Sequence, residues 1–299
     1  MPWHGEERVV LAEGKRFVGR NSASRGRETR ERKGGRGRMA CTLEASRNEG
    51  LDDLLLEFSS EEVSIRRQVH EHEGAQLSGF VSFPSRRETE LSPCIMVVHT
   101  AAGPHEAFIV DKVAKLARLG YIAFAVDMFG EDLDSGSFKE EGRTLLQSRM
   151  LAALETSLSL AGVDKNKVAA IGYCFGGTAV LDLARANPAL LRGVVSFHGI
   201  LDHPPALQDV DLRGGPKVLA FNGYSDPFVP AAGKHAFAEE MESKGARWQL
   251  HEFGGCVHAF TRPDKTTQEH KEKGFFYDKY AADSSWAMTR AFFESVFSP

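Results

Sequence analysis

A cysteine flanked by glycines lies where an apolar run of the sequence meets a helical pattern. The run at residues 168–171 leads into the Gly-x-Cys-x-Gly-Gly motif of residues 172–177, and apolar residues at helical spacing follow at once. A strand, a sharp turn and a helix in this order are typical of a nucleophile elbow, which holds one reactive side chain above the edge of a sheet. We expect Gly172 and Gly176 to let the two backbones pass closely, and glycine to supply the strained backbone angles of the turn. Cys174 is therefore a candidate nucleophile, and the competing interpretation is a buried structural cysteine.

Two polar side chains downstream each come directly after an apolar, strand-like run. They are Asp226 and His258, and the resulting chain order is nucleophile, acid, histidine. This is the order of the triads in α/β hydrolases. His258 would accept the thiol proton of Cys174, and Asp226 would hold the imidazole and stabilise its charged form. Asp127 also ends a strand-like run, but it precedes Cys174, so the order favours Asp226.

A triad of this kind needs backbone N–H groups that hold the oxyanion of the reaction intermediate. One is expected from Phe175, the residue after the nucleophile, and the other from the loop after the apolar run at residues 94–98, at Ala101. Loss of one such donor typically lowers the rate by about 10²–10³-fold.

The net charge and the cysteine content limit which classes of function are compatible with the sequence. The net charge is −4, and because residues 1–38 carry nine Arg, two Lys and five Glu (+6), the remainder carries −10. A mildly acidic body argues against nucleic-acid binding, and no apolar run approaches the ~20 residues of a membrane span. The four cysteines form no CxxC pair, which favours a reduced, cytoplasmic protein over a disulfide scaffold or a zinc site.

The sequence predicts a basic N-terminal segment, residues 1–58, before a folded domain at residues 59–299. Arg, Gly, Ser and Glu dominate residues 19–38 without apolar periodicity, as in disordered chains. Residues 1–38 of this segment are interpreted as a solvated tail, a targeting peptide, or upstream sequence from a misassigned start with Met39 as the initiator. The domain is expected to be a monomer or a small homo-oligomer.

Short apolar runs alternate with helical patterns through the rest of the chain. Runs at residues 94–98, 121–126, 193–197, 218–221 and 248–253 are predicted strands, and the last helix is predicted at residues 286–297. Alternating strands and helices indicate an α/β fold with a mostly parallel central sheet covered by helices on both faces.

Other polar residues near the strand ends receive plainer interpretations. His99, His105 and Glu106 match no known metal-ligand spacing, so no metal is expected. His198 is interpreted as a hydrogen-bonded loop histidine, and Cys256 as at most a weak candidate redox partner of Cys174. No G-x-G-x-x-G and no phosphate-loop lysine motif is present, so no nucleotide cofactor is expected.

Together, five stretches resemble the dienelactone hydrolase (carboxymethylenebutenolidase) family. They are GYIAFAVDMFGE at 120–131, IGYCFGG at 171–177, VVSFHG at 194–199, SDPFVP at 225–230 and VHAFTR at 257–262. The resemblance covers residues 60–298. It implies an α/β-hydrolase fold, a triad of Cys174, Asp226 and His258, and hydrolysis of a cyclic enol-lactone to a keto acid.

The resemblance also implies a carboxylate-bearing substrate, with departures. Arg262 occupies the place of an arginine that binds the substrate carboxylate, and Arg143 and Arg149 are candidates for a second. The family has a Glu after the third strand that helps activate the cysteine, and the register puts Thr100 there, with Glu106 too far along to match simply. Two alternatives remain: a neutral ester or thioester hydrolase on the same triad, and a non-catalytic binding or sensor protein.

Overall fold

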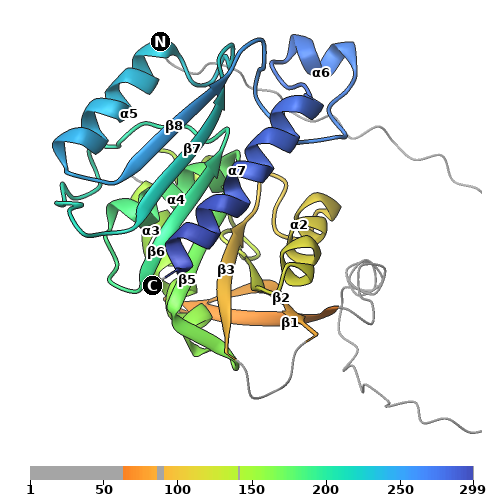
Figure 1. Cartoon of the computed structure of the whole chain (residues 1–299), viewed down its shortest axis with the longest axis vertical. Helices are drawn as coiled ribbons and strands as arrows, with labels where there is room; N and C mark the ends of the chain where they lie inside the picture. Colours follow the sequence, from red (N-terminus) through yellow and green to blue (C-terminus); the bar gives the residue numbers. More distant parts are fainter. Residues whose placement is uncertain (1–62, 86–90, 141, 299) are drawn as a thin grey trace, which may run out of the picture. The chain divides into compact units, whose positions relative to one another are not determined.

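The computed structural model describes residues 63–85, 91–140 and 142–298 (Figure 1). The predicted N-terminal segment at residues 1–58 lies outside these residues, as does the predicted start of the domain at residue 59. Both therefore stay predictions.

The described chain forms an eight-stranded sheet with helices between the strands. The strand order is β1-β2-β4-β3-β5-β6-β7-β8. Pairing is antiparallel at β1–β2 and β2–β4 and parallel from β4 onward. The elements are β1 Val63–His72, β2 Ala75–Pro84, β3 Ser92–Val98, α2 Ala107–Arg118, β4 Ile122–Val126, a 3₁₀ turn Ser135–Phe138, α3 Gly142–Ser159, β5 Val163–Tyr173, α4 Phe175–Arg185, β6 Leu191–Phe197, β7 Lys217–Gly223, α5 Ala231–Ser243, β8 Trp248–Phe253, α6 Gln268–Glu272 and α7 Lys279–Phe297.

Helices cover both faces of the sheet, so the predicted α/β class is confirmed (Figure 1). Side chains of α3, α4 and α5 pack on one face with alternate strand residues such as Met96 and Val98. Side chains of α2 and α7 pack on the other with the intervening residues, Ile95 and Val97. Burial on both faces explains why β3 and β4 are continuous apolar runs instead of alternating ones.

The termini of the elements differ from prediction where the sequence is polar. Helix α7 begins at Lys279, seven residues before the predicted start, because its first turns carry Tyr280 and other exposed residues without an apolar stripe. Asp278 caps this helix by accepting a hydrogen bond from Ala281 N at 2.8 Å. The five-residue helix α6 has no buried residue, so the sequence has no apolar periodicity there that would predict it.

Parallel pairing brings the carboxyl ends of β3, β5, β7 and β8 to one edge of the sheet. The residues of the predicted site follow these strands, in the loops or, for Phe175, at the start of α4, as expected for an open α/β sheet. Across the described part of the chain, no helix combines the length and the apolar character that a membrane crossing requires. The same residues contain no cluster of three or more histidine, cysteine or acidic side chains suited to a metal ion.

Candidate active site

The turn between β5 and α4 holds Cys174 in a strained conformation. Its backbone angles are φ 55° and ψ −114°, and it is the N-cap residue of α4. A Cβ at Gly172 would lie 1.9 Å from Gly176 O, and one at Gly176 would lie 2.3 Å from Val98 O. The glycines therefore allow the close approach that was predicted. The strained angles fall on Cys174 itself and not on a glycine, which corrects that part of the prediction.

The structure brings Asp226 and His258 together with Cys174. His258 Nδ1 lies 2.8 Å from Asp226 Oδ2, and both side chains are buried. The Asp226 carboxylate also accepts a hydrogen bond from Phe228 N at 2.9 Å, which fixes its orientation. The other side of the imidazole is hydrogen-bonded to the Cys174 thiol. Asp127, the competing acid, instead accepts hydrogen bonds from backbone N–H groups, including Ser78 N at 2.9 Å.

The two titratable groups shift each other toward an ion pair. Burial alone would lower the pKa of His258, but the hydrogen bonds and charges of Asp226 and Cys174 raise it to about 9. Burial alone would raise the pKa of Cys174, but His258 and two backbone N–H groups hold it below its ordinary value. A half-buried thiolate facing a buried imidazolium is a typical environment of a reactive cysteine.

The two backbone N–H groups that lower the pKa of Cys174 are those of Phe175 and Ala101. They come from different loops, one opening α4 and one following β3. Their convergence on the sulfur means that a carbonyl oxygen attached to an attacked carbon would lie within their reach.

A network of charged groups supports the loop that carries Ala101. Thr100 Oγ1 donates to Glu106 Oε1 at 2.5 Å and accepts from Ala102 N at 3.1 Å. Arg262 Nη1 donates to Glu106 Oε2 at 2.6 Å and to Thr100 Oγ1 at 3.3 Å. Glu106 therefore belongs beside Thr100 and Arg262, although the sequence register placed it too far along. The loop after β3 folds back so that Glu106 contacts Thr100, and no local sequence pattern predicts this contact.

Arg262 pairs with a second carboxylate, Asp264, in addition to Glu106. Its Nε lies 2.9 Å from Asp264 Oδ1 and its Nη2 lies 3.1 Å from Asp264 Oδ2. Burial alone would raise the pKa of Asp264, but Arg262 and Lys265 lower it to about 2. Two carboxylates, Glu106 and Asp264, thus already face the guanidinium that the resemblance assigns to substrate binding.

The two arginines considered for a second carboxylate contact lie in structural networks. Arg143 pairs with Asp182, with Nε 2.5 Å from Oδ2, and with Asp202 at 3.1 Å. Arg149 Nη1 donates to the backbone oxygens of Met128 and Phe129. Both guanidinium groups hold loops and helices together in the structure.

His198 has a closer relation to the site than the sequence suggested. Its Nδ1 accepts a hydrogen bond from Cys174 N at 3.1 Å, and its Nε2 lies 2.9 Å from Thr261 Oγ1. Burial, together with the charges of His258 and Arg262, lowers the pKa of His198 well below its ordinary value. The ring centroids of His198 and His258 lie only 4.9 Å apart. A neutral His198 imidazole fits here because a charged one would repel the His258 imidazolium.

Aromatic side chains border the nucleophile and its base. Phe129, Phe138 and Phe175 pack together, with ring centroids 5.2–6.1 Å apart. Phe228 and Phe275 meet the His258 ring edge-on at 5.1 and 5.5 Å. Aromatic rings in these positions suit an apolar or unsaturated substrate.

Cys256, the weak redox candidate, is a buried free thiol. Burial and the nearby Asp278 raise its pKa to about 11, so it is mostly protonated at neutral pH. This disfavours a reactive role.

Comparisons with known proteins find a matching family and several relatives. A model of the dienelactone hydrolase family matches residues 78–297. An uncharacterised protein of Caenorhabditis elegans is 32% identical over 153 residues, which cover 51% of this chain and 95% of that protein. A candidate carboxymethylenebutenolidase of Salmonella typhimurium is 25% identical over 221 residues, covering 64% of this chain and 81% of that protein.

A solved structure extends the comparison to the fold. The crystal structure of P91, a dienelactone hydrolase-like promiscuous phosphotriesterase from metagenomic libraries, aligns with a TM-score of 0.70. The two chains are 27% identical, and the match covers 79% of this chain and 100% of the other.

Proposed function

The chain belongs to the dienelactone hydrolase family and is an ester or lactone hydrolase, and we propose that it acts through covalent catalysis by Cys174. The observation that carries the proposal is the convergence of three groups on one sulfur. The imidazole of His258 and the N–H groups of Phe175 and Ala101 all act to lower the pKa of Cys174. Asp226 holds the imidazole from behind.

In the first half-reaction, the Cys174 thiolate attacks the carbonyl carbon of the substrate. The negative charge moves from sulfur to the carbonyl oxygen, and the N–H groups of Phe175 and Ala101 stabilise it there. The carbon–oxygen single bond of the ester then breaks, and the His258 imidazolium gives its proton to the leaving oxygen. In a lactone the leaving oxygen stays attached to the acyl chain.

In the second half-reaction, neutral His258 takes a proton from water. The resulting hydroxide attacks the thioester carbonyl, and the carbon–sulfur bond breaks to release the acid and restore the Cys174 thiolate. Asp226 stabilises the imidazolium in both halves without taking a proton.

For the substrate, we propose a cyclic enol-lactone or related ester with a carboxylate that contacts Arg262. The substrate carboxylate would have to displace Glu106 from the guanidinium, because the two are 2.6 Å apart. That pairing also favours a second candidate, a neutral ester or thioester hydrolase, since Arg262 already faces Glu106 and Asp264. Apolar walls beside Cys174 are compatible with either substrate.

A matched substrate pair separates these candidates. We would measure kcat/KM for a carboxylate-bearing dienelactone and for its neutral methyl ester, with wild-type protein, Cys174→Ala and Arg262→Met. Cys174→Ala should abolish turnover of both substrates, and retained turnover would contradict the nucleophile assignment. A preference for the carboxylate that disappears in Arg262→Met supports the enol-lactone proposal. Equal or better turnover of the methyl ester supports the neutral-ester candidate.

We also propose that the protein works in the cytoplasm as a monomer or small homo-oligomer. Cys94, Cys174 and Cys256 are free thiols, which suits a reducing compartment. Fractionation with an antibody and light scattering of the purified chain test the two statements separately.

A further inference from the structure

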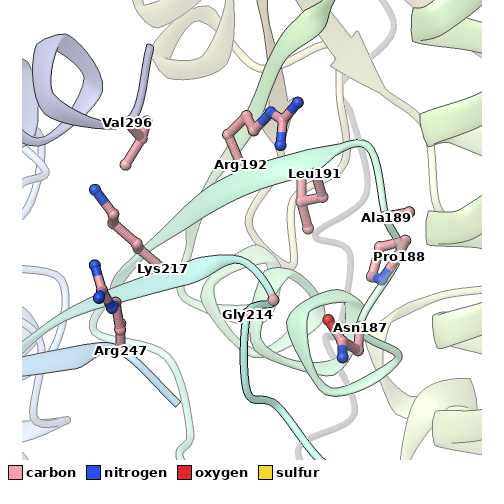
Figure 2. A pocket seen from close by; sticks show the side chains of 10 residues that line it. Asn187, Pro188, Ala189, Leu191, Arg192, Gly214, Lys217, Arg247 and Val296 are labelled. Carbon is pink, nitrogen blue, oxygen red and sulfur yellow. The ribbon is translucent and has the colours of Figure 1, made fainter. Parts of the chain in front are cut away.

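A cavity of about 290 Å³ lies at the amino-terminal ends of β6, β7 and β8 (Figure 2). Its walls come from the loop after α4, the turn before β7 and the last turn of α7, and its residues include Asn187, Arg192, Gly214, Lys217, Arg247 and Val296. The candidate active site lies at the carboxyl ends of the strands. The two are separated by the length of β7, about 20 Å for its seven residues.

The charges that line this cavity are all positive. Arg192, Lys217 and Arg247 contribute side chains, and no acidic residue belongs to the lining. Among the described residues, none of the three forms an ion pair with a carboxylate. The neighbouring Arg213, outside the lining, contrasts with them because its guanidinium pairs with Asp211 at 2.6 Å. The cavity is therefore a positive site in a domain whose net charge is negative.

Strand pairing sets two of these cations next to each other. Val218 pairs with Trp248, so the preceding residues, Lys217 and Arg247, open adjacent parallel strands. Val218 N donates to Arg247 O at 2.8 Å, which fixes the two backbones. Figure 2 shows both side chains extending from the starts of β7 and β8. Like charges in adjacent positions repel one another, so an anion between them would relieve the repulsion.

The third cation stands on a local irregularity of β6. Leu191 pairs with Val168 and Gly193 pairs with Ala169, which leaves Arg192 as an extra residue in the ladder. Such a bulge turns a side chain away from the regular alternation of the strand. Arg192 Nε donates to Asn166 O on β5 at 2.7 Å, so this side chain is anchored toward β5 and points away from Lys217 and Arg247 (Figure 2).

The turn before β7 leaves room beside the cations. Gly214 has φ +76°, and a Cβ there would meet no atom within 4 Å. Gly215 allows the Asn187 side chain to approach, because a Cβ there would lie 2.1 Å from Asn187 Oδ1. Asn187 Nδ2 donates to Asp211 O at 2.9 Å, so this wall is held in place.

From this arrangement we propose that the cavity binds a small phosphate-bearing anion. The Lys217 ammonium and the Arg247 guanidinium lie side by side and match a ligand that carries at least two negative charges, and a guanidinium fork suits phosphate oxygens. A volume of about 290 Å³ is at the small end of ligand sites, so it fits a phosphate or diphosphate on a small molecule. This site is independent of the proposed hydrolase chemistry.

The test is isothermal titration of the full chain with inorganic pyrophosphate and with orthophosphate. The site variant is Lys217→Met with Arg247→Met, and the charge control is Lys279→Met, at the opposite end of α7 from Val296. Wild type and control should bind pyrophosphate more tightly than orthophosphate, and affinity should fall with added salt. The double variant should bind at least about tenfold more weakly, because it loses two charge-assisted contacts. Esterase activity should match in all three proteins, which shows that the variants are folded.

Two results would overturn the proposal. One is no heat of binding for either anion at millimolar concentration in low salt. The other is equal pyrophosphate affinity in wild type and the double variant, which would locate binding elsewhere. A third measurement separates the source of the phosphate. If the double substitution abolished only binding to vesicles of phosphatidic acid and phosphatidylcholine, the ligand would be a lipid headgroup and not a soluble anion.

Discussion

Reactivity in this protein depends on how one thiol and one imidazole share a proton. Loss of solvent contact by itself would keep the half-buried Cys174 thiol protonated and the buried His258 imidazole neutral. His258 and the N–H groups of Phe175 and Ala101 lower the pKa of the Cys174 thiol, and Cys174 and Asp226 raise the pKa of the His258 imidazole. The zwitterion therefore exists over a pH window bounded below by the lowered pKa of Cys174 and above by the raised pKa of His258, about 9.

Alkylation of Cys174 should follow this window. Wild-type protein should react with iodoacetamide with an inflection below the usual thiol pKa of about 8.5. In His258→Ala the inflection should move above that value, since burial then acts without an opposing charge, and the rate at pH 6 should fall by at least about tenfold. Mass spectrometry of the labelled peptide gives the rates, with the raised-pKa thiol of Cys256 as an internal reference. An unchanged inflection in the variant would show that His258 does not activate the thiol, which would favour a non-catalytic protein.

At the scale of the elements, the site depends on close contacts between backbones. The crossing of β5, α4 and β3 leaves no space for a Cβ at Gly172 or Gly176. At the end of β7, α5 supplies Lys234, whose buried ammonium group donates to Gly223 O and Tyr224 O at 3.0 Å and pairs with Glu252. These contacts hold the segment that leads into Asp226.

Gly172→Ala should disrupt the elbow. The added methyl group would lie 1.9 Å from Gly176 O, so β5 and α4 must move apart, and the destabilisation should be at least about 3 kcal/mol. Gly254→Ala is the matched control, because a Cβ there meets nothing within 4 Å and its φ is not positive. Urea denaturation gives both values. A Gly172→Ala protein with wild-type stability and activity would mean that the close crossing is absent in solution.

Lys234→Met should reduce both stability and activity. It leaves the Gly223 and Tyr224 oxygens without their donor, which costs about 2–3 kcal/mol, and it loosens the loop that carries Asp226. Lys244→Met, at the C-cap of the same helix, is the control. Lys244 pairs with Asp209 and Glu240, away from the site, so this variant should lose stability without losing kcat. If kcat fell equally in both variants at equal stability, the specific role of Lys234 would be rejected.

At the scale of the whole molecule, periodicity and order predicted most of the architecture. Buried strands with continuous apolar runs and helices with apolar stripes could be read directly, and so could the triad order of Cys174, Asp226 and His258. Contacts formed by loops that fold back could not. Glu106 reaches Arg262 across 156 positions, and the hydrogen bond from Cys174 N to His198 depends on a turn with φ 41°. Neither has a period or a local composition that marks it.

The same limit applies to buried histidines, whose environment only the fold defines. His70 on β1 is buried, and neither ring nitrogen has a hydrogen-bond partner among the described residues. Burial lowers its pKa to about 4, and Asp127, Arg149 and His72 also act on it. His99, the first residue after β3, is also buried, and burial likewise lowers its pKa to about 4. Both imidazoles are therefore neutral in the folded protein at pH 5, whereas the unfolded chain binds protons with a pKa of about 6.5.

This difference makes acid destabilise the fold before the carboxylates titrate. Because the unfolded state binds more protons between about pH 6.5 and 4, stability falls as pH falls, by about 2 kcal/mol per histidine between pH 7 and pH 5. His258 acts in the opposite direction, since its raised pKa gives stability that is complete below about pH 6.5 and lost as pH rises through about 9. It therefore cannot compensate for the loss in acid.

His70→Phe isolates the contribution of one histidine to this pH dependence. The phenylalanine ring keeps the edge-on contact with Phe124 and lacks the two ring nitrogens that have no partner. Urea denaturation should find this variant at least as stable as wild type at pH 7 and about 2 kcal/mol less sensitive to the change to pH 5. An identical pH dependence in the two proteins would mean that His70 is hydrated or already charged in the folded state.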